Sequence, residues 1–235
     1  MTIDCIDSHY YNNLMKKFLY SYSFAILFVV FTLFLRTVDV QAVGPLGSKI
    51  GFAGLNVAVH ELFGMNPFWY KLTQAFGLVA IAVAAVFACT GLVQLIKRKS
   101  LLKVDYELLM LGVVYILLML LYVLFEKIPF NYRPVILDPA EGLEPSYPST
   151  HTMLILTILG TAIQLCGKYI KNAKLVFCIR VVSLVIMALT IIGRLICGVH
   201  WFSDIVGGVL ISLAFISFYK ELVALKSKKE VIDEN

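Results

Sequence analysis

The sequence predicts an all-α polytopic membrane protein, with six transmembrane helices in a single domain over residues 1–235. Three observations favour this fold class. Of the 235 residues, 60% are hydrophobic and only 15% are charged, and the mean hydropathy is +0.87, whereas soluble domains are only about half apolar. Six apolar runs approach the roughly 20 residues that cross a bilayer. The cations cluster beside those runs, as is typical of membrane proteins.

The first predicted span covers residues 18–35, directly after Lys16 and Lys17. A cleaved signal peptide is the competing interpretation, because residues 40–42 resemble a cleavage site. This apolar run is, however, longer than the roughly 7–15 residues of a signal-peptide core. The next segment, 50–63, is moderately amphipathic, and we expect it to be re-entrant or to lie along the membrane interface. Aromatic residues 68–70 are expected at the level of the lipid headgroups.

The remaining spans are predicted over residues 72–96, 106–125, 150–166, 175–192 and 201–218. The loop at 126–149 contains five of the seven prolines and cannot be a regular helix. Its acidic residues Asp138, Glu141 and Glu144 are irregularly spaced and are expected to be solvated.

The distribution of cations predicts the orientation. Fourteen of the twenty Lys and Arg residues lie on the side of the two termini, which the positive-inside rule assigns to the cytoplasm. The six on the opposite side are Arg36, Lys49, Lys71, Lys127, Arg133 and Arg194. Because the cations sit in short patches beside apolar runs, nucleic-acid binding is excluded. The five cysteines show neither disulfide nor metal-ligand spacing, and we interpret them as small core residues.

Polar residues mark the predicted extracytoplasmic ends of helices 3–6. They are Lys127, Arg133, Ser149, Thr150, His151, Arg194, His200 and Asp204. Between His151 and Arg194 the chain is long enough to cross the membrane inward and return. All of these residues are therefore expected at one membrane depth. Singly, an arginine at a helix end is usually an interface anchor. Ionisable groups at membrane depth are costly, however, so their gathering on one face favours a functional site.

Their chemistry fits a phosphoryl group. Three neighbouring cations repel one another unless an anion joins them, and the planar fork of arginine suits phosphate oxygens. The Ser149 hydroxyl can donate a hydrogen bond, and the backbone amides of Thr150 and His151 at a helix start attract anions. His200 and Asp204 are four residues apart, which places them on one helix face within hydrogen-bond reach.

Three motifs follow one another in the second half of the chain. They are Lys127 with Arg133-Pro134, then Pro148-Ser149-Thr150-His151, and finally Gly193-Arg194 with His200 and Asp204. In this order they resemble the motifs of the type-2 phosphatidic acid phosphatase superfamily, whose integral-membrane members are six-span lipid phosphatases. Three departures stand out. Five residues separate Lys127 from Arg133, one fewer than is usual in the family. Thr150 replaces a glycine, and Gly193 replaces a serine.

The resemblance implies a role for each residue. His200 would attack phosphorus and form a phosphohistidine, with Asp204 orienting its ring. His151 would protonate the leaving lipid oxygen and then activate water. Lys127, Arg133, Ser149, Thr150 and Arg194 would hold the phosphoryl oxygens. No metal or other cofactor would be needed, because the cations supply the charge stabilisation.

The leading hypothesis is therefore a phosphatase of the cell membrane whose partners are the bilayer and a lipid phosphate. Candidate substrates are undecaprenyl pyrophosphate, phosphatidic acid and phosphatidylglycerol phosphate. A lipid phosphotransferase remains an alternative, as does a non-catalytic transporter or binding protein for anionic lipids. The oligomeric state is left open by the sequence.

Overall fold

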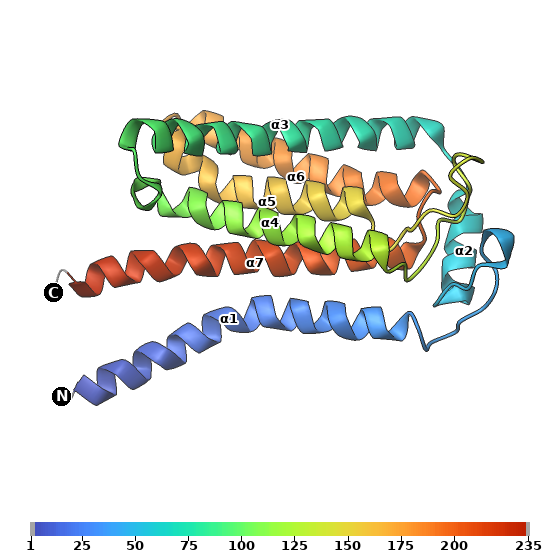
Figure 1. Cartoon of the computed structure of the whole chain (residues 1–235), viewed down its shortest axis with the longest axis horizontal. Coiled ribbons are helices and arrows are strands. Elements are labelled where there is room, and N and C mark those ends of the chain that lie inside the picture. The colour runs from blue at the N-terminus through green and yellow to red at the C-terminus, as the bar shows by residue number, and fades with distance from the viewer. Residues whose placement is uncertain (1–2, 234–235) are drawn as a thin grey trace.

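The computed structural model describes residues 3–233, and side chains are described for residues 19–226. Within these residues the chain forms an all-helical bundle (Figure 1). Its α-helices are α1 (Ile3–Phe34), α2 (Ala53–Phe63), α3 (Pro67–Arg98), α4 (Tyr106–Lys127), α5 (Thr150–Tyr169), α6 (Ala173–Ile196) and α7 (Phe202–Asp233). Both termini lie at one end of the bundle. The short helix α2 lies across the opposite end, beside the loop that joins α4 to α5.

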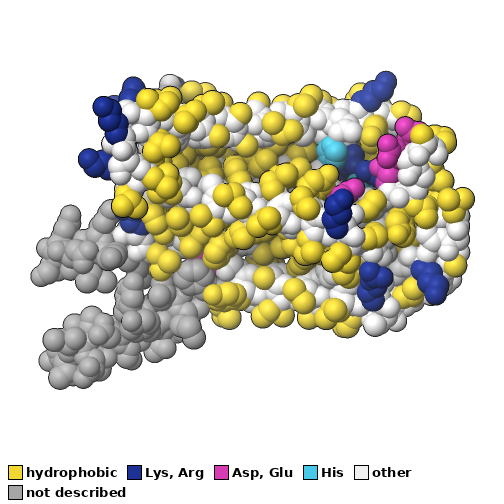
Figure 2. Space-filling view, in the orientation of Figure 1, with side chains coloured by type: hydrophobic (Ala, Val, Ile, Leu, Met, Phe, Trp, Pro, Cys, Tyr) yellow, Lys and Arg dark blue, Asp and Glu magenta, His cyan; other side chains and the backbone are white. Residues whose placement is uncertain are grey.

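The all-helical membrane fold predicted from the sequence is confirmed. Helices α3 to α7 are each long and apolar enough to cross a bilayer, and the described part of α1 adds a shorter apolar stretch, Leu19–Phe34. Apolar side chains cover the visible flank of the bundle, whereas most charged side chains lie near its two ends (Figure 2). The protein is thus a multi-pass membrane protein, and the count of six spans stays a prediction.

Helix α3 begins earlier than the predicted second span because residue 66 caps it. The Asn66 side-chain oxygen accepts hydrogen bonds from the backbone N–H groups of Phe68 and Trp69 at 3.1 and 3.3 Å. Pro67 occupies the first helical position, where its missing N–H costs nothing. The aromatic residues 68–70 therefore form the first turn of α3. This turn lies at the end of the bundle that carries α2.

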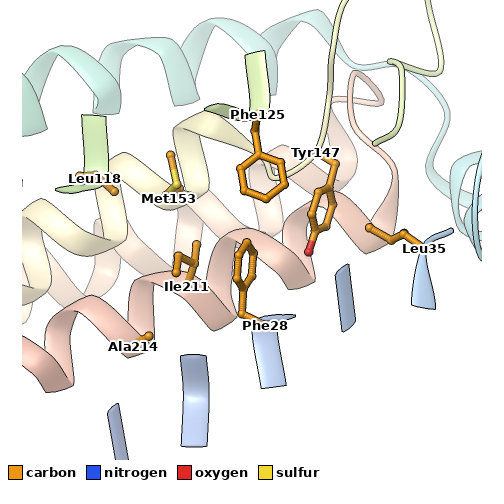
Figure 3. Packing of buried hydrophobic residues seen from close by; sticks show 8 residues of the cluster. All are labelled: Phe28, Leu35, Leu118, Phe125, Tyr147, Met153, Ile211 and Ala214. Carbon is orange, nitrogen blue, oxygen red and sulfur yellow. The ribbon is translucent and has the colours of Figure 1, made fainter. Parts of the chain in front are cut away.

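One core cluster anchors the loop between α4 and α5. Tyr147 projects from this loop among Phe28 of α1, Phe125 of α4 and Ile211 of α7 (Figure 3). Its hydroxyl lies 2.7 Å from Oγ1 of Thr32, so the polar tip of the buried ring is also satisfied. The loop residues that flank Tyr147 are consequently held at a fixed position over the end of the bundle.

Helices α3 and α6 approach each other closely at Gly193. A Cβ atom added at this position would lie 2.7 Å from Cγ2 of Thr73 and 2.7 Å from Cε3 of Trp69. Neither neighbour can yield freely, because Thr73 is fully buried and both side chains belong to one helix. The glycine that departs from the family motif is therefore required by the packing of α3.

A polar cluster ties α3, α4 and α5 together at the end that carries the α3–α4 turn. Asp105 accepts hydrogen bonds from Arg98 at 2.8 Å, Gln94 at 2.9 Å and Tyr169 at 2.8 Å. Burial acts to raise the pKa of Asp105, but these donors outweigh it and hold the pKa well below its ordinary value. The ionised carboxylate thus stabilises this end of the bundle.

The interpretation of the cysteines as core residues is only partly right. Cys166 and Cys197 are buried, but Cys89 and Cys178 are exposed. Their helices, α3 and α6, have long apolar outer faces, where a small apolar side chain can face lipid as well as protein. Cys5 lies outside the residues whose side chains are described.

We expect Gly193→Ser to destabilise the protein, because the added side chain overpacks the α3–α6 contact at a cost of about 1–3 kcal/mol. Gly112→Ser is the matched control, since no atom lies within 4 Å of a Cβ added to this α4 residue. Thermal unfolding in detergent should show a lower midpoint for Gly193→Ser alone. Equal midpoints for the two variants would contradict the packing account.

We expect Asp105→Asn to lower stability at pH 7 by about 1–3 kcal/mol, the usual worth of hydrogen bonds to a charged group. Because the pKa of Asp105 is lower in the folded than in the unfolded state, its ionisation stabilises the fold fully above the unfolded-state pKa of about 3.9. The stabilisation is lost as the pH falls from there through the folded-state pKa. The difference from wild type should therefore shrink below about pH 4. Thermal unfolding against pH measures it, with the exposed loop variant Glu141→Gln as control. A difference independent of pH would contradict the ionised cluster.

Candidate active site

The loop between α4 and α5 doubles back on itself and presents its residues to the start of α7. The backbone N–H of Arg133 donates to the carbonyl of Glu144 at 3.0 Å, and that of Ser146 donates to the carbonyl of Asn131 at 2.9 Å. Together with the buried Tyr147 these bonds fix a proline-rich segment that contains no helix. They bring Arg133 and Ser146 to one place although twelve residues lie between them.

His200 is held with one ring nitrogen bonded and the other free. Nδ1 lies 3.1 Å from the carbonyl oxygen of Ser146, which can only accept, so Nδ1 carries the hydrogen. Nε2 then presents its lone pair. It is buried and has no hydrogen-bond partner among the described residues. An imidazole oriented in this way is arranged as a nucleophile or base.

Asp204 is near His200, but for a different reason from the one predicted. His200 precedes α7, so the two residues do not share a helix face, and Asp204 Oδ2 lies 3.6 Å from Nδ1. The carboxylate instead accepts from the backbone N–H of Trp201 at 3.0 Å and from the side chain of Asn131 at 3.2 Å. It therefore fixes the turn that carries His200, and the ring hydrogen bond goes to Ser146.

Asn131 and Ser146 are positioning residues that sequence reasoning missed. Asn131 is fully buried and also accepts from the backbone N–H of Gly51 at 3.3 Å. The side-chain nitrogen of Asn56 in α2 donates to the hydroxyl of Ser203 at 2.9 Å, which connects α2 to the same network. The sequence signal for Asn56 is a polar residue within the amphipathic 50–63 segment. Asn131 sits in an irregular loop that gives no periodicity to read.

Arg194 is fully buried and Arg133 is half-buried, and both have buried donors left over. Arg194 has no exposed surface. Its Nη1 donates to Thr73 Oγ1 at 3.3 Å, and its guanidinium lies over the ring of Tyr70 at 5.7 Å. Its Nε has no partner among the described residues, nor does Nη1 of Arg133. Unsatisfied donors on buried cations are rare, and they suit an anion that would accept from both.

Glu144 is not the solvated residue expected from the sequence. Its Oε2 lies 2.8 Å from Nε of Arg133, in a loop that folds back far enough to join them. No carboxylate forms an ion pair with Arg194 in the part of the chain that the structure describes. The guanidinium group of Arg194 is therefore left without a paired anion among the described residues, which favours the binding of one.

The start of α5 contributes three further predicted residues. His151 is half-buried, and its Nε2 contacts the side-chain oxygen of Gln74 on α3. Ser149 is fully buried. Its hydroxyl accepts from Thr152 at 3.0 Å, and its backbone N–H donates to the carbonyl of Asp204 at 2.9 Å. Thr150 is half-buried and is the first residue of α5.

Four of the predicted residues, His200, Arg194, Arg133 and His151, interact electrostatically. Burial lowers the pKa of His200 well below its ordinary value, and the charges of Arg194, Arg133 and His151 lower it further. His200 is therefore neutral at physiological pH, the form in which Nε2 can attack.

Lys127 is the one predicted residue that the structure does not bring to this group. It is exposed at the end of α4, and no contact among the described residues joins it to this group.

An apolar cavity of about 500 Å³ opens beside His151 between α3, α4 and α5. Its polar lining is limited to Gln74, Tyr115 and His151, and the rest is formed by Gly, Ala, Leu, Ile and Met residues. The cationic group of Arg133, Arg194 and His200 thus lies next to an apolar cavity that His151 also lines.

Comparison with known proteins gives a family and a related fold. Residues 107–228 match the PAP2 superfamily. A crystal structure of a transmembrane PAP2 type phosphatidylglycerolphosphate phosphatase from Bacillus subtilis has a similar fold. It shows 19% sequence identity and a TM-score of 0.60, with 89% of this chain and 96% of that chain covered. A search of curated proteins gave no match. Because the family match spans just over half of the chain and includes the residues at this site, the protein belongs to the PAP2 superfamily.

Proposed function

We propose that this protein is a lipid phosphatase that hydrolyses a lipid phosphate or pyrophosphate without a metal ion. One observation carries the proposal: two guanidinium groups lie beside a buried histidine, and buried donors of both, like Nε2 of the histidine, have no partner among the described residues. A phosphoryl group supplies both the oxygens that these donors lack and the electrophile that the histidine needs. Membership of the PAP2 superfamily supports the same reaction.

The apolar cavity supports a lipid substrate over a water-soluble one. Because it ends at His151, a hydrocarbon chain lying in it would place its phosphate among the arginines. Phosphatidylglycerol phosphate, phosphatidic acid and undecaprenyl pyrophosphate all combine such a chain with a terminal phosphoryl group. The similar fold of a phosphatidylglycerolphosphate phosphatase favours the first of these.

In the proposed mechanism, Nε2 of His200 attacks phosphorus and its lone pair forms an N–P bond. The P–O bond to the lipid breaks, and His151 gives a proton to the leaving oxygen. Arg133, Arg194, Ser149 and the amide of Thr150 hold the phosphoryl oxygens through both steps. Water activated by His151 then releases phosphate from the phosphohistidine. Asp204 keeps the turn of His200 in place throughout.

The positive-inside rule places the reaction at the extracytoplasmic face of the cell membrane, with both termini in the cytoplasm. The termini and the site lie at opposite ends of the bundle, which supports this orientation. The substrate would then be drawn from the outer leaflet.

We expect the purified protein in detergent to release inorganic phosphate from a lipid phosphate in excess EDTA, and vanadate to inhibit the release. His200→Ala should reduce the rate by about 10³-fold or more, because it removes the nucleophile. A phosphate-release assay measures this, and size-exclusion chromatography controls for folding. Undiminished release by His200→Ala would refute the nucleophile. Labelled acceptor lipid in place of free phosphate would indicate a phosphotransferase, and no turnover of any lipid phosphate would favour an anionic-lipid transporter.

Arg194→Gln should lower kcat/KM by about 10²–10³-fold, the usual cost of removing one preorganised donor from a developing oxyanion. Lys127→Gln should cost less, because Lys127 is exposed and outside the buried group. Initial rates on one lipid phosphate compare the two. A larger loss for Lys127→Gln would mean that this lysine, and not Arg194, is the main phosphate ligand.

A further inference from the structure

Gln74 belongs to none of the three motifs, yet it contacts the proposed proton donor. It lies in the second turn of α3, a mostly apolar transmembrane helix in which an amide side chain is costly without hydrogen bonds. Its side-chain nitrogen donates to the hydroxyl of Tyr70 at 3.1 Å, and its side-chain oxygen contacts Nε2 of His151. The amide is therefore oriented from both ends.

This contact fixes the position of a proton. A carbonyl oxygen only accepts hydrogen bonds, so the Nε2 atom facing it must carry a hydrogen. Gly77 lies beside the ring one turn further along α3, where an added Cβ would be in ordinary contact with Cδ2 of His151 at 3.4 Å. The ring thus packs against α3 and is oriented from it by the hydrogen bond of Gln74.

The direction of this N–H is informative. Gln74, Gly77 and His151 all line the apolar cavity, whereas the two arginines and His200, which interact electrostatically with His151, do not line it. The Nε2–H group therefore points toward the apolar cavity. This is the side on which the lipid chain of a bound substrate would extend from its phosphate. The side-chain oxygen of Gln74 accepts from this N–H in the free protein. The departing lipid oxygen of a substrate would accept from the same N–H at a neighbouring position.

We propose that Gln74 is a positioning residue that holds the Nε2–H of His151 ready for the lipid-bearing oxygen of the substrate. This inference rests on the proposed phosphatase function. As the N–P bond to His200 forms, the electron pair of the breaking P–O bond stays on the lipid oxygen. That oxygen takes the proton from Nε2 of His151, and the ring later recovers a proton from the attacking water. Gln74 accepts from this N–H before the transfer and again once the ring has recovered its proton from water.

A purely structural role for Gln74, as a tie between α3 and α5, predicts something different. Loss of a structural tie lowers activity on every substrate. Loss of proton positioning matters only when the leaving oxygen needs a proton. An alkoxide is a poor leaving group that needs one, whereas a nitrophenolate leaves readily without one. The dependence of activity on the leaving group therefore separates the two roles.

The experiment compares Gln74→Met with wild type on two detergent-solubilised substrates, a long-chain alkyl phosphate and a nitrophenyl phosphate bearing an alkyl chain of the same length. We expect kcat/KM to fall by about 10-fold or more on the alkyl phosphate, as part of the roughly 10²–10⁴-fold worth of general acid catalysis. On the nitrophenyl substrate it should fall by less than about threefold. Tyr70→Phe, which removes the hydroxyl that orients the amide, should show the same selectivity with a smaller loss.

Val79→Met is the matched control, because Val79 is exposed on the same helix and does not line the cavity. It should match wild type on both substrates. Equal losses for Gln74→Met on both substrates would overturn the inference in favour of a structural tie, and so would the absence of any loss. If wild type releases phosphate from neither substrate, the proposed phosphatase function itself fails.

Discussion

The hydrogen bonds of Asp204 hold the site together. Its carboxylate fixes the turn that carries His200 and the buried Asn131 of the α4–α5 loop, and its backbone carbonyl accepts from Ser149 at the start of α5. Three segments that are distant in sequence are thereby joined at one point. Because a buried carboxylate without such donors would be strongly destabilising, the surrounding backbone has little freedom to rearrange. The free Nε2 of His200 is a consequence of this arrangement.

Burial of the arginines has a cost that a substrate would offset. Arg194 is fully buried, its partners within residues 19–226 are a threonine hydroxyl and an aromatic face, and Arg133 forms an ion pair with one carboxylate. A buried cation with unpaired donors is unfavourable in the free protein. Binding a phosphoryl group removes that penalty, so the same interactions that weaken the fold locally favour the anion. This trade between local stability and ligand affinity is typical of functional sites.

The spans and most of the site could be predicted from the sequence, because apolar length and motif order are local signals. The membrane crossings predict that Arg133, His151, Arg194 and His200 lie at one membrane depth, whereas their mutual contacts depend on how the helices and the loop pack. The supporting contacts could not be predicted in the same way. Asn131, Ser146 and Gln74 act through tertiary contacts across 50 residues or more, and the ion pair of Glu144 depends on how an irregular loop folds back. The sequence predicts Asp204 close to His200 from a shared helix face, whereas α7 begins only at Phe202 and the carboxylate approaches His200 through the turn before it.

A structure of the protein with bound vanadate would test the central claim most directly, since vanadate adopts the geometry of a phosphoryl group under attack. The account predicts vanadium bonded to Nε2 of His200, with vanadate oxygens in hydrogen-bond contact with both Arg133 and Arg194. Vanadate bound away from His200, or contacting neither guanidinium group, would contradict it.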